Sequence, residues 1–180
     1  ILADLKNVEN TGLAVAGGAS TITLTAEASA IDGYYVGMEV YIYANTGAGQ
    51  RRVVSGYVGA TRVATVSVAW AVVPNTTSAY EVSALSVTVD AGKGAQYTDP
   101  ATSGKAEYIR INSEIIRYTS KVGDQLKWTD ATYRAQFGST RSDHGAGDSA
   151  QLCRAYINKT VANVLTSLLT ESGISSGYIS

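Results

Sequence analysis

The sequence predicts a mainly β protein with two small β-sandwich or barrel-like modules followed by a C-terminal amphipathic helix. The residue choice favours strands, because β-branched residues are plentiful and the aromatic content is dominated by 12 tyrosines against one Phe. The 18 glycines recur at short intervals, as turns between short strands require. Only the C-terminal segment changes to the helical spacing of apolar residues.

The composition favours a packed core and gives the chain almost no net charge. Of 180 residues, 45% are hydrophobic and 16% are charged, with 14 basic against 15 acidic side chains. This balance disfavours a nucleic-acid or anionic-membrane surface, and no apolar run approaches the ~20 residues of a membrane span. The single cysteine, Cys153, excludes an intramolecular disulfide and a cysteine-based zinc site. We expect it to be a small apolar residue near the end of a strand.

The first module is expected over residues 17–84, after an N-terminal connecting segment at residues 1–16. Alternating apolar and polar residues, interrupted by turn residues, mark its strands. These strands are expected at residues 20–25, 36–43, 50–57, 61–69 and 79–82. The turn at residues 58–60 contains Gly59, which we expect to adopt the positive φ of a tight hairpin turn.

The second module is expected over residues 85–157. Its strands are predicted at residues 85–89, 108–111, 114–119, 125–129 and 149–156. Residues 90–104 contain three glycines and a proline and are expected to form a loop. Tight turns are predicted at Asn112–Ser113 and Gly123–Asp124.

Residues 158–180 are expected to form a helix and a tail, with continuation into a longer protein left open. The spacing i, i+3, i+4, i+7, i+8 places one apolar face on this helix, formed by Val161, Val164, Leu165, Leu168 and Leu169. Asn158 or Thr160 can cap its start, and Gly173 can take the left-handed position after its end. The leucine face needs a packing partner, because so short a helix is marginal in isolation.

Candidate chemical sites are few. The segment 47–52 resembles a glycine loop, but a strand follows it, whereas a phosphate loop opens a helix. His144 is the only histidine, so Asp143, His144 and Asp148 make a poor transition-metal set. A triad of serine, His144 and Asp148 lacks an oxyanion hole. The loop aspartates lack the spacing of a calcium loop. We therefore expect no catalytic residue, no metal and no cofactor.

Two stretches resemble proteins of bacteriophage particles. Residues 47–82, with Trp70 near the middle, resemble a small β module of tail and fibre proteins. Residues 111–152 resemble a pattern of tail-tip proteins. That pattern has a Glu-Ile-Ile-Arg-Tyr strand, an Arg-Gly/Ala-Gln-Phe/Leu-Gly-Thr turn and a His-Ala-Ala-Gly loop, and this chain matches it at residues 114–118, 134–140 and 144–147. The helix that follows resembles the segment that comes next in tail hub proteins. Ala135 stands where the pattern usually has Gly, and Ser139 intervenes before Thr140.

The resemblance implies a structural segment of a phage tail-tip hub or baseplate. It also implies that the chain forms a homo-oligomer, a trimer by resemblance. The chain would be made in the host cytoplasm and would become part of the tail of the virion. Other tail proteins would be its partners. The interface candidates are charged, aromatic and leucine side chains that suit subunit contacts: Arg51, Arg52, Tyr57, Trp70, Glu114, Arg117, Arg134, Arg141, Leu165 and Leu168.

Two alternatives remain at this stage. One is a tail-fibre module that binds a host surface receptor or glycan through its tyrosines and Trp70. The other is a cell-wall hydrolase domain, which the residues favour least, because no acid pair or metal set is evident. We therefore expect the chain not to be an enzyme.

Overall fold

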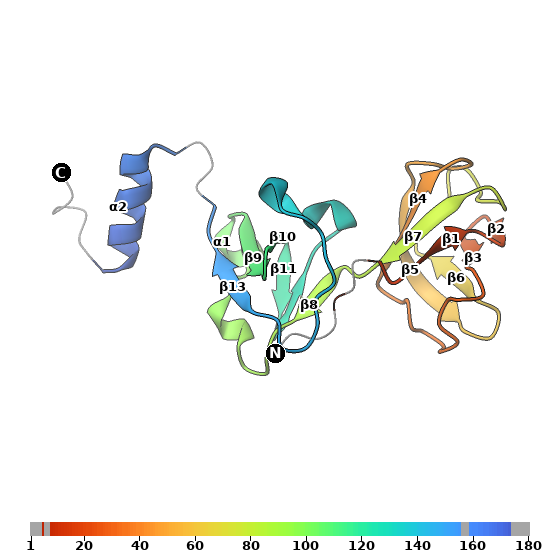
Figure 1. Ribbon diagram of the computed structural model, residues 1–180, viewed down its shortest axis with the longest axis horizontal. Helices are drawn as coiled ribbons and strands as arrows, with labels where there is room; N and C mark the ends of the chain where they lie inside the picture. The colour runs from red at the N-terminus through yellow and green to blue at the C-terminus, as the bar shows by residue number, and fades with distance from the viewer. Residues whose placement is uncertain (1–4, 6–7, 156–158, 174–180) are drawn as a thin grey trace.

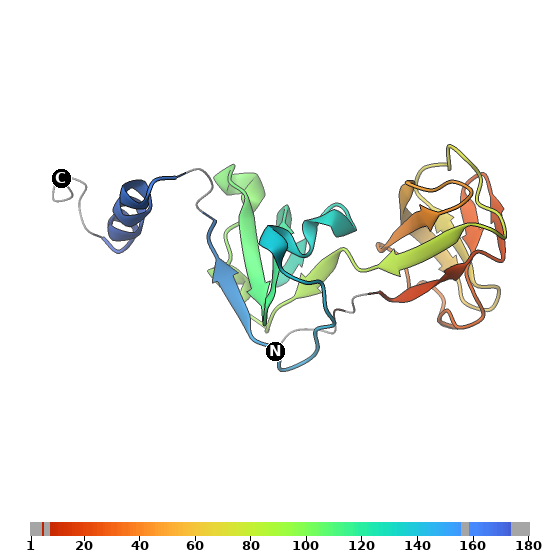
Figure 2. The same cartoon turned by 45° about the horizontal axis from the view of Figure 1, so that its top comes forward.

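The computed structural model describes residues 5, 8–155 and 159–173 and confirms a mainly β protein with a C-terminal helix. Figures 1 and 2 show two β modules along the long axis, with helix α2 (Val161–Glu171) at the end away from the first module. Within the described residues, no helix is both long and apolar enough to span a membrane.

The first module is one seven-stranded antiparallel sheet with the order β1-β7-β4-β5-β6-β3-β2. Its strands are β1 (Asn10–Leu13), β2 (Ala16–Gly18), β3 (Thr21–Thr23), β4 (Glu39–Ala44), β5 (Arg51–Val58), β6 (Val63–Val66) and β7 (Ala79–Ser83). The two edge strands, β1 and β2, are consecutive in the chain and separated by Ala14 and Val15. The sheet therefore curls until its edges approach each other, which leaves it barrel-like.

The first module begins earlier than the sequence indicated. Residues 10–13 were expected in a connecting segment, but they pair with β7 as an edge strand. Buried Asn10 is satisfied there, because its Oδ1 accepts a hydrogen bond of 2.5 Å from the Tyr80 hydroxyl. The core inside the curl is aliphatic and aromatic and includes Ile22, Leu24, Val40, Ile42, Val82 and Trp70.

The β5–β6 hairpin exists, but the expected role of Gly59 is wrong. The left-handed residue in this turn is Arg62, with φ 58°. Gly59 is needed for space: a Cβ there would lie 2.1 Å from the carbonyl oxygen of Ala30. Its N–H donates to Asp32 Oδ1 at 2.7 Å. The glycine therefore allows the 29–37 loop to close against the hairpin.

The second module consists of two three-stranded antiparallel sheets, ordered β10-β9-β13 and β11-β12-β8. Their strands are β8 (Ser86–Thr88), β9 (Glu107–Ile111), β10 (Glu114–Tyr118), β11 (Ser120–Val122), β12 (Gln125–Lys127) and β13 (Ala150–Cys153). The tight turns at Asn112–Ser113 and Gly123–Asp124 are confirmed, with φ 52° at Asn112 and 58° at Gly123. The closing strand is shorter than predicted, and Cys153 ends it as a free, half-buried thiol.

Short helices occupy parts of the second module that were expected to be loop. They are η1 (Gly94–Gln96), α1 (Pro100–Ser103), η2 (Ala131–Tyr133) and η3 (Gln136–Gly138). Asp99 caps α1 by accepting from the Ala101 N–H, and the following proline suits the first helical position. These single turns were hidden from pattern analysis because they are too short to show a period.

Leu5 belongs to the core of the second module, although β1–β7 follow it in the chain. Its backbone exchanges two hydrogen bonds of 2.7 Å with His144. The first module is therefore an insertion between Leu5 and β8. The second core comprises Leu5, Leu85, Val87, Val89, Tyr97, Ile109, Ile111, Ile116, Tyr118, Leu126 and Trp128.

Helix α2 follows the predicted periodicity. The Thr160 hydroxyl caps it by accepting from the Asn163 N–H at 3.2 Å, and Gly173 after its end has φ 88°. Asn158, the other predicted cap, lies outside the described residues. The apolar face remains open to solvent, with Leu165 53% and Leu168 47% exposed.

Candidate functional site

The most concentrated polar site is a charge cluster inside the second module, centred on Glu114 of β10. The Arg134 guanidinium donates to it from Nε at 2.9 Å and from Nη2 at 2.6 Å, in the two-pronged geometry that suits a carboxylate. Both side chains are 0% exposed. Backbone N–H groups of Ala135 and Ser142 also donate to the carboxylate, at 3.2 and 3.1 Å. Glu114 therefore ties β10 to both ends of the 134–142 segment.

His144 completes this cluster from the other side. Its Nε2 lies 2.8 Å from Glu114 Oε2, so the proton of this nitrogen points to the carboxylate. Its Nδ1 lies 3.3 Å from Asp148 Oδ2, and the imidazole is fully buried. Together with the backbone pairing to Leu5, these contacts fix the ring between two carboxylates. We name Glu114, Arg134 and His144 the buried charge cluster.

The electrostatics of the cluster favour an ionised Glu114. Burial by itself raises the pKa of this carboxyl group, but the hydrogen bonds and charge of Arg134 oppose it, followed by His144 and the Ser142 N–H. The net result is a pKa below the ordinary value of 4.5. A buried carboxylate is tolerated here because its lone pairs meet donors from several directions.

The backbone after Arg134 is strained at two residues that are not glycine. Ala135 has φ 53° and Phe137 has φ 56°, both in the left-handed region that favours glycine. The strained turn is held because the Ala135 N–H bonds Glu114 and the Phe137 ring packs on Tyr108 at 5.1 Å.

A second set of polar contacts joins the two modules. Glu39 of β4 accepts from Arg51 Nη1 at 2.6 Å and from the Ala131 N–H at 3.3 Å. Burial raises the pKa of Glu39, and the nearby Arg51 charge opposes that shift without cancelling it. Arg141 donates from Nη2 to Ser83 Oγ at 2.5 Å, and its Nη1 lies 3.4 Å from Glu81 Oε1. These contacts make the junction a packed interface.

The predicted interface residues lie in different places: some are buried in the charge cluster, some lie at the junction between the modules, and some are exposed on α2. Glu114 and Arg134 are sealed in the cluster, and Arg51 and Arg141 serve the junction. Arg117 lies over the Tyr133 ring at 5.2 Å. Leu165 and Leu168 remain exposed on α2. The buried pair is therefore unavailable as a subunit contact, contrary to expectation, because the side chains satisfy each other internally.

The aromatic candidates of the first module are also internal. Trp70 is 5% exposed, and its indole N–H donates to the Thr21 carbonyl at 3.2 Å. Arg52 covers that ring at 5.5 Å while donating to the carbonyls of Val68 and Ala69. Buried Tyr57 donates its hydroxyl proton to the Ser29 carbonyl at 2.6 Å. Neither Tyr57 nor Trp70 presents an open ring face for sugar stacking.

The arrangement offers little accessible chemistry. Ser142 Oγ lies 3.4 Å from His144 Nε2, but that nitrogen already faces the Glu114 carboxylate. Ser139 Oγ is engaged by the Ile115 N–H and the Gln136 carbonyl. No cluster of three His, Cys, Asp or Glu side chains suited to a metal ion occurs among residues 5, 8–155 and 159–173. The cluster therefore holds the fold together and does not meet solvent.

From the sequence, Glu114 and Arg134 were expected at a subunit interface, and His144 was expected to have no catalytic or metal-binding role. Their meeting could not be derived from spacing, because the three come from a strand, a turn and a loop. The only sequence signal for their proximity was that all three residues lie within residues 111–152, the stretch that resembles one pattern. Comparisons with protein-family models, with curated proteins and with solved structures yielded no match to this chain.

Proposed function

We propose that this chain is a structural segment of a bacteriophage tail-tip hub or baseplate and acts through protein–protein assembly. The observation that carries the proposal is the convergence of Glu114, Arg134 and His144. Each comes from a different one of the three motifs, strand, turn and loop, within residues 111–152, the stretch that resembles tail-tip proteins. Because each motif supplies one member of the same buried network, the cluster gives a physical reason for their occurrence together.

The nature of the cluster supports a structural role. A sealed ionic network fixes loop positions, and removing any member leaves an unpaired buried group. Such a network suits a module that must hold its shape under load. The inserted first module extends away from the second module in Figure 1, where it is available for contacts with neighbouring tail proteins.

Helix α2 is the contact surface that the proposal assigns to self-assembly. Leu165 and Leu168 are exposed on one face, although leucines of a short helix normally gain their stability from packing. A symmetric homo-oligomer would bury this face repeatedly, and the resemblance favours a trimer.

The location of the chain is tested by immunogold labelling of phage particles whose genome encodes this sequence. Label at the tail tip is the expected result. Label confined to peripheral fibres would instead support the receptor-binding alternative, and particles without label would overturn both assignments.

The role of α2 is tested by light scattering after size-exclusion chromatography. The unaltered chain should have the mass of an oligomer, and the double variant Leu165→Glu/Leu168→Glu should be monomeric. Thr170→Glu, which places one charge at an exposed polar position of the same helix, should keep the oligomer. A monomeric unaltered chain would contradict assembly through this helix.

A further inference from the structure

One face of the β9–β10 pair presents an exposed aromatic ring beside two arginines. The register places Tyr108 opposite Arg117. It also places Arg110 opposite Ile115, on the same face of the sheet, because side chains two residues apart in a strand point the same way. The Phe137 ring of η3 packs on Tyr108, with the two centroids 5.1 Å apart, and remains 57% exposed. We name Arg110, Ile115, Arg117 and Phe137 the aromatic–cationic face.

A strained backbone holds the exposed ring on this face. Phe137 has φ 56°, and Ala135 two residues earlier has φ 53°, in a region that disfavours any residue with a Cβ. Strain of this kind persists only where the surrounding structure supports it, and it is concentrated at binding and catalytic sites. The buried Glu114 carboxylate supplies the support, since it accepts from the Ala135 N–H at 3.2 Å and binds Arg134 beside it. The ring is therefore fixed before any partner arrives, which lowers the entropic cost of a contact.

The two arginines of the face have no acidic partner among the residues that the structure describes. Arg117 lies over the Tyr133 ring at 5.2 Å, and its Nε is buried without a hydrogen-bond partner. Arg110 is exposed. Asp130, the acid at the start of η2, caps that turn instead by accepting from the Thr132 N–H at 2.9 Å. The face therefore carries positive charge that the protein does not neutralise.

These features define the chemistry of a partner. Aromatic residues and arginines are enriched in protein–protein contacts, where desolvation of a rigid ring supplies much of the affinity. The unneutralised cations favour a partner that brings carboxylates, because complementary charge steers and orients association. A nucleic acid would bind through many phosphate contacts, which the net charge of −1 disfavours.

We propose that the aromatic–cationic face binds an acidic segment of another protein. An apolar side chain of that segment would cover Phe137, and its carboxylates would meet Arg110 and Arg117. The proposal is independent of the phage assignment, because it rests on β9, β10 and η3 alone. The face is also separate from the leucine face of α2, so loss of one contact leaves the other intact.

The test is an NMR titration of the intact, isotope-labelled chain with three synthetic peptides. The acidic peptide is Asp-Glu-Leu-Phe-Glu-Asp, and the other two carry Asn and Gln or only Lys at the acidic positions. The acidic peptide should shift the amide signals of Arg110, Ile115 and Phe137. It should bind roughly three- to tenfold more tightly than the uncharged peptide, as two partly exposed ion pairs allow, and this advantage should shrink as salt is added.

Two variants separate the contributions of the ring and of the charge. Phe137→Gly removes the exposed ring and suits the positive φ, so the fold is kept while affinity for the acidic peptide should fall roughly tenfold or more. Arg110→Glu reverses one charge at an exposed position, and this variant should prefer the Lys peptide to the acidic one.

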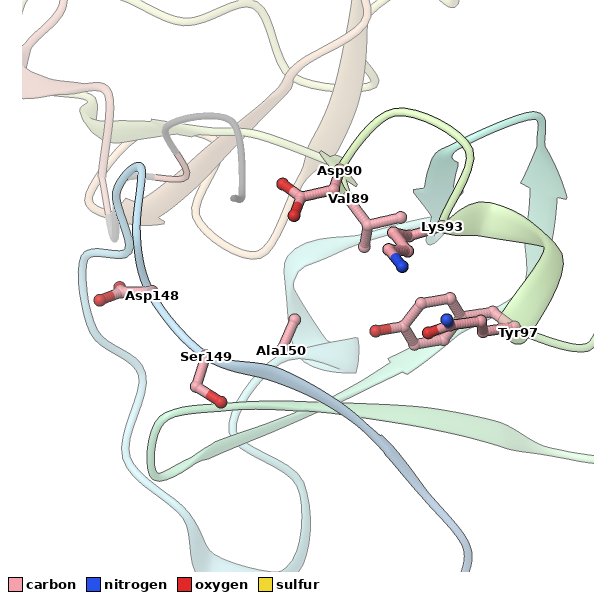
Figure 3. Close-up of a pocket in the computed structure, with 8 residues that line it drawn as sticks. Val89, Asp90, Lys93, Tyr97, Asp148, Ser149 and Ala150 are labelled. Atoms are coloured by element: carbon pink, nitrogen blue, oxygen red, sulfur yellow. The ribbon is translucent and has the colours of Figure 1, made fainter.

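Matched controls lie outside the face. Val68→Ser changes an apolar side chain that is 62% exposed in the first module. Lys93→Gln removes a cation that lines a separate pocket together with Tyr97 and Ala150 (Figure 3). Both controls should leave affinity for the acidic peptide unchanged.

Several results would overturn the proposal. They are no binding of the acidic peptide, equal or tighter binding of either other peptide, tighter binding of a DNA oligonucleotide, and unchanged affinity in both Phe137→Gly and Arg110→Glu. A change in the oligomeric mass of the peptide-free chain in Phe137→Gly would also overturn it, because the face would then be a contact between copies.

Discussion

Arg134 and Glu114 form a two-pronged ion pair whose side chains are both 0% exposed, with Arg134 Nη2 2.6 Å from Glu114 Oε2. The pair joins a strand to a turn 20 residues later in the chain. Loss of one member of a fully buried ion pair strongly lowers the free energy of unfolding, because the remaining charge stays buried without its counter-ion. This asymmetry makes the cluster the most sensitive point of the second module.

Glu114→Gln should lower the free energy of unfolding of the second module by about 3–5 kcal/mol, because it leaves the Arg134 cation buried without a counter-ion. Urea unfolding followed by Trp128 fluorescence measures this loss, in a Trp70→Phe background that leaves one tryptophan. Glu107→Gln, on neighbouring β9 and half-buried, should change stability by less than about 0.5 kcal/mol. Equal effects of the two variants would show that the cluster has no special role.

The stability of the second module should fall in acid. The pKa of Glu114 is lowered on folding, so its contribution is fully present above the unfolded pKa of about 4.5 and is lost as pH falls through the lower folded pKa. Unfolding by urea at a series of pH values from 7 to about 3 measures this loss. In Glu114→Gln, the acid-dependent part assigned to this group should disappear, and an unchanged pH profile would contradict the assignment.

Glu39 at the junction should respond to pH in the opposite direction. Its pKa is raised on folding, so its contribution is largest below the unfolded pKa of about 4.5 and declines as pH rises through the folded pKa. Glu39→Gln keeps an oxygen for the Ala131 N–H and should remove this decline. Thermal unfolding between pH 4 and 7, compared with the unaltered chain, is the measurement. A steeper decline in the variant would refute the assigned sign.

Ala135→Gly should stabilise the protein by roughly 0.5–1 kcal/mol, because φ 53° strains a residue with a Cβ and costs glycine nothing. The gain is reduced by the larger backbone entropy of glycine in the unfolded chain. Ala146→Gly, in a nearby exposed turn where alanine does not have a positive φ, should be neutral or destabilising. Urea midpoints of the two variants measure the difference, and a loss of stability in Ala135→Gly would count against strain at this position.

Gly59→Ala should destabilise the first module by about 1–3 kcal/mol, since its Cβ would collide with backbone of the 29–37 loop. Gly56→Ala on β5, the strand that leads into this turn, is the matched control, because a Cβ there meets Thr65 at an ordinary 3.7 Å. Trp70 fluorescence during urea unfolding reports on this module, whose core contains that ring. Equal stability of the two variants would contradict the close packing.

The periodic elements could be predicted because their signals are local. The strands, the turns at Asn112–Ser113 and Gly123–Asp124, and the capped α2 helix all follow from patterns that span a few residues. The role of Gly59 could not be predicted, because it depends on Ala30 in a distant loop. The edge strand at residues 10–13 was missed because its buried asparagine acquires a partner only from Tyr80.

The sequence by itself determined the β class, the hairpin turns and the apolar face of α2, since each depends on neighbours within one element. Only the tertiary structure decided that Glu114, Arg134 and His144 form one sealed network and that Leu5 joins the core of the second module. The physical reason is that burial and hydrogen-bond partnership are properties of segments brought together from distant parts of the chain. Glu114 and Arg134 were interface candidates in the sequence, but in the fold they bind each other inside the second module.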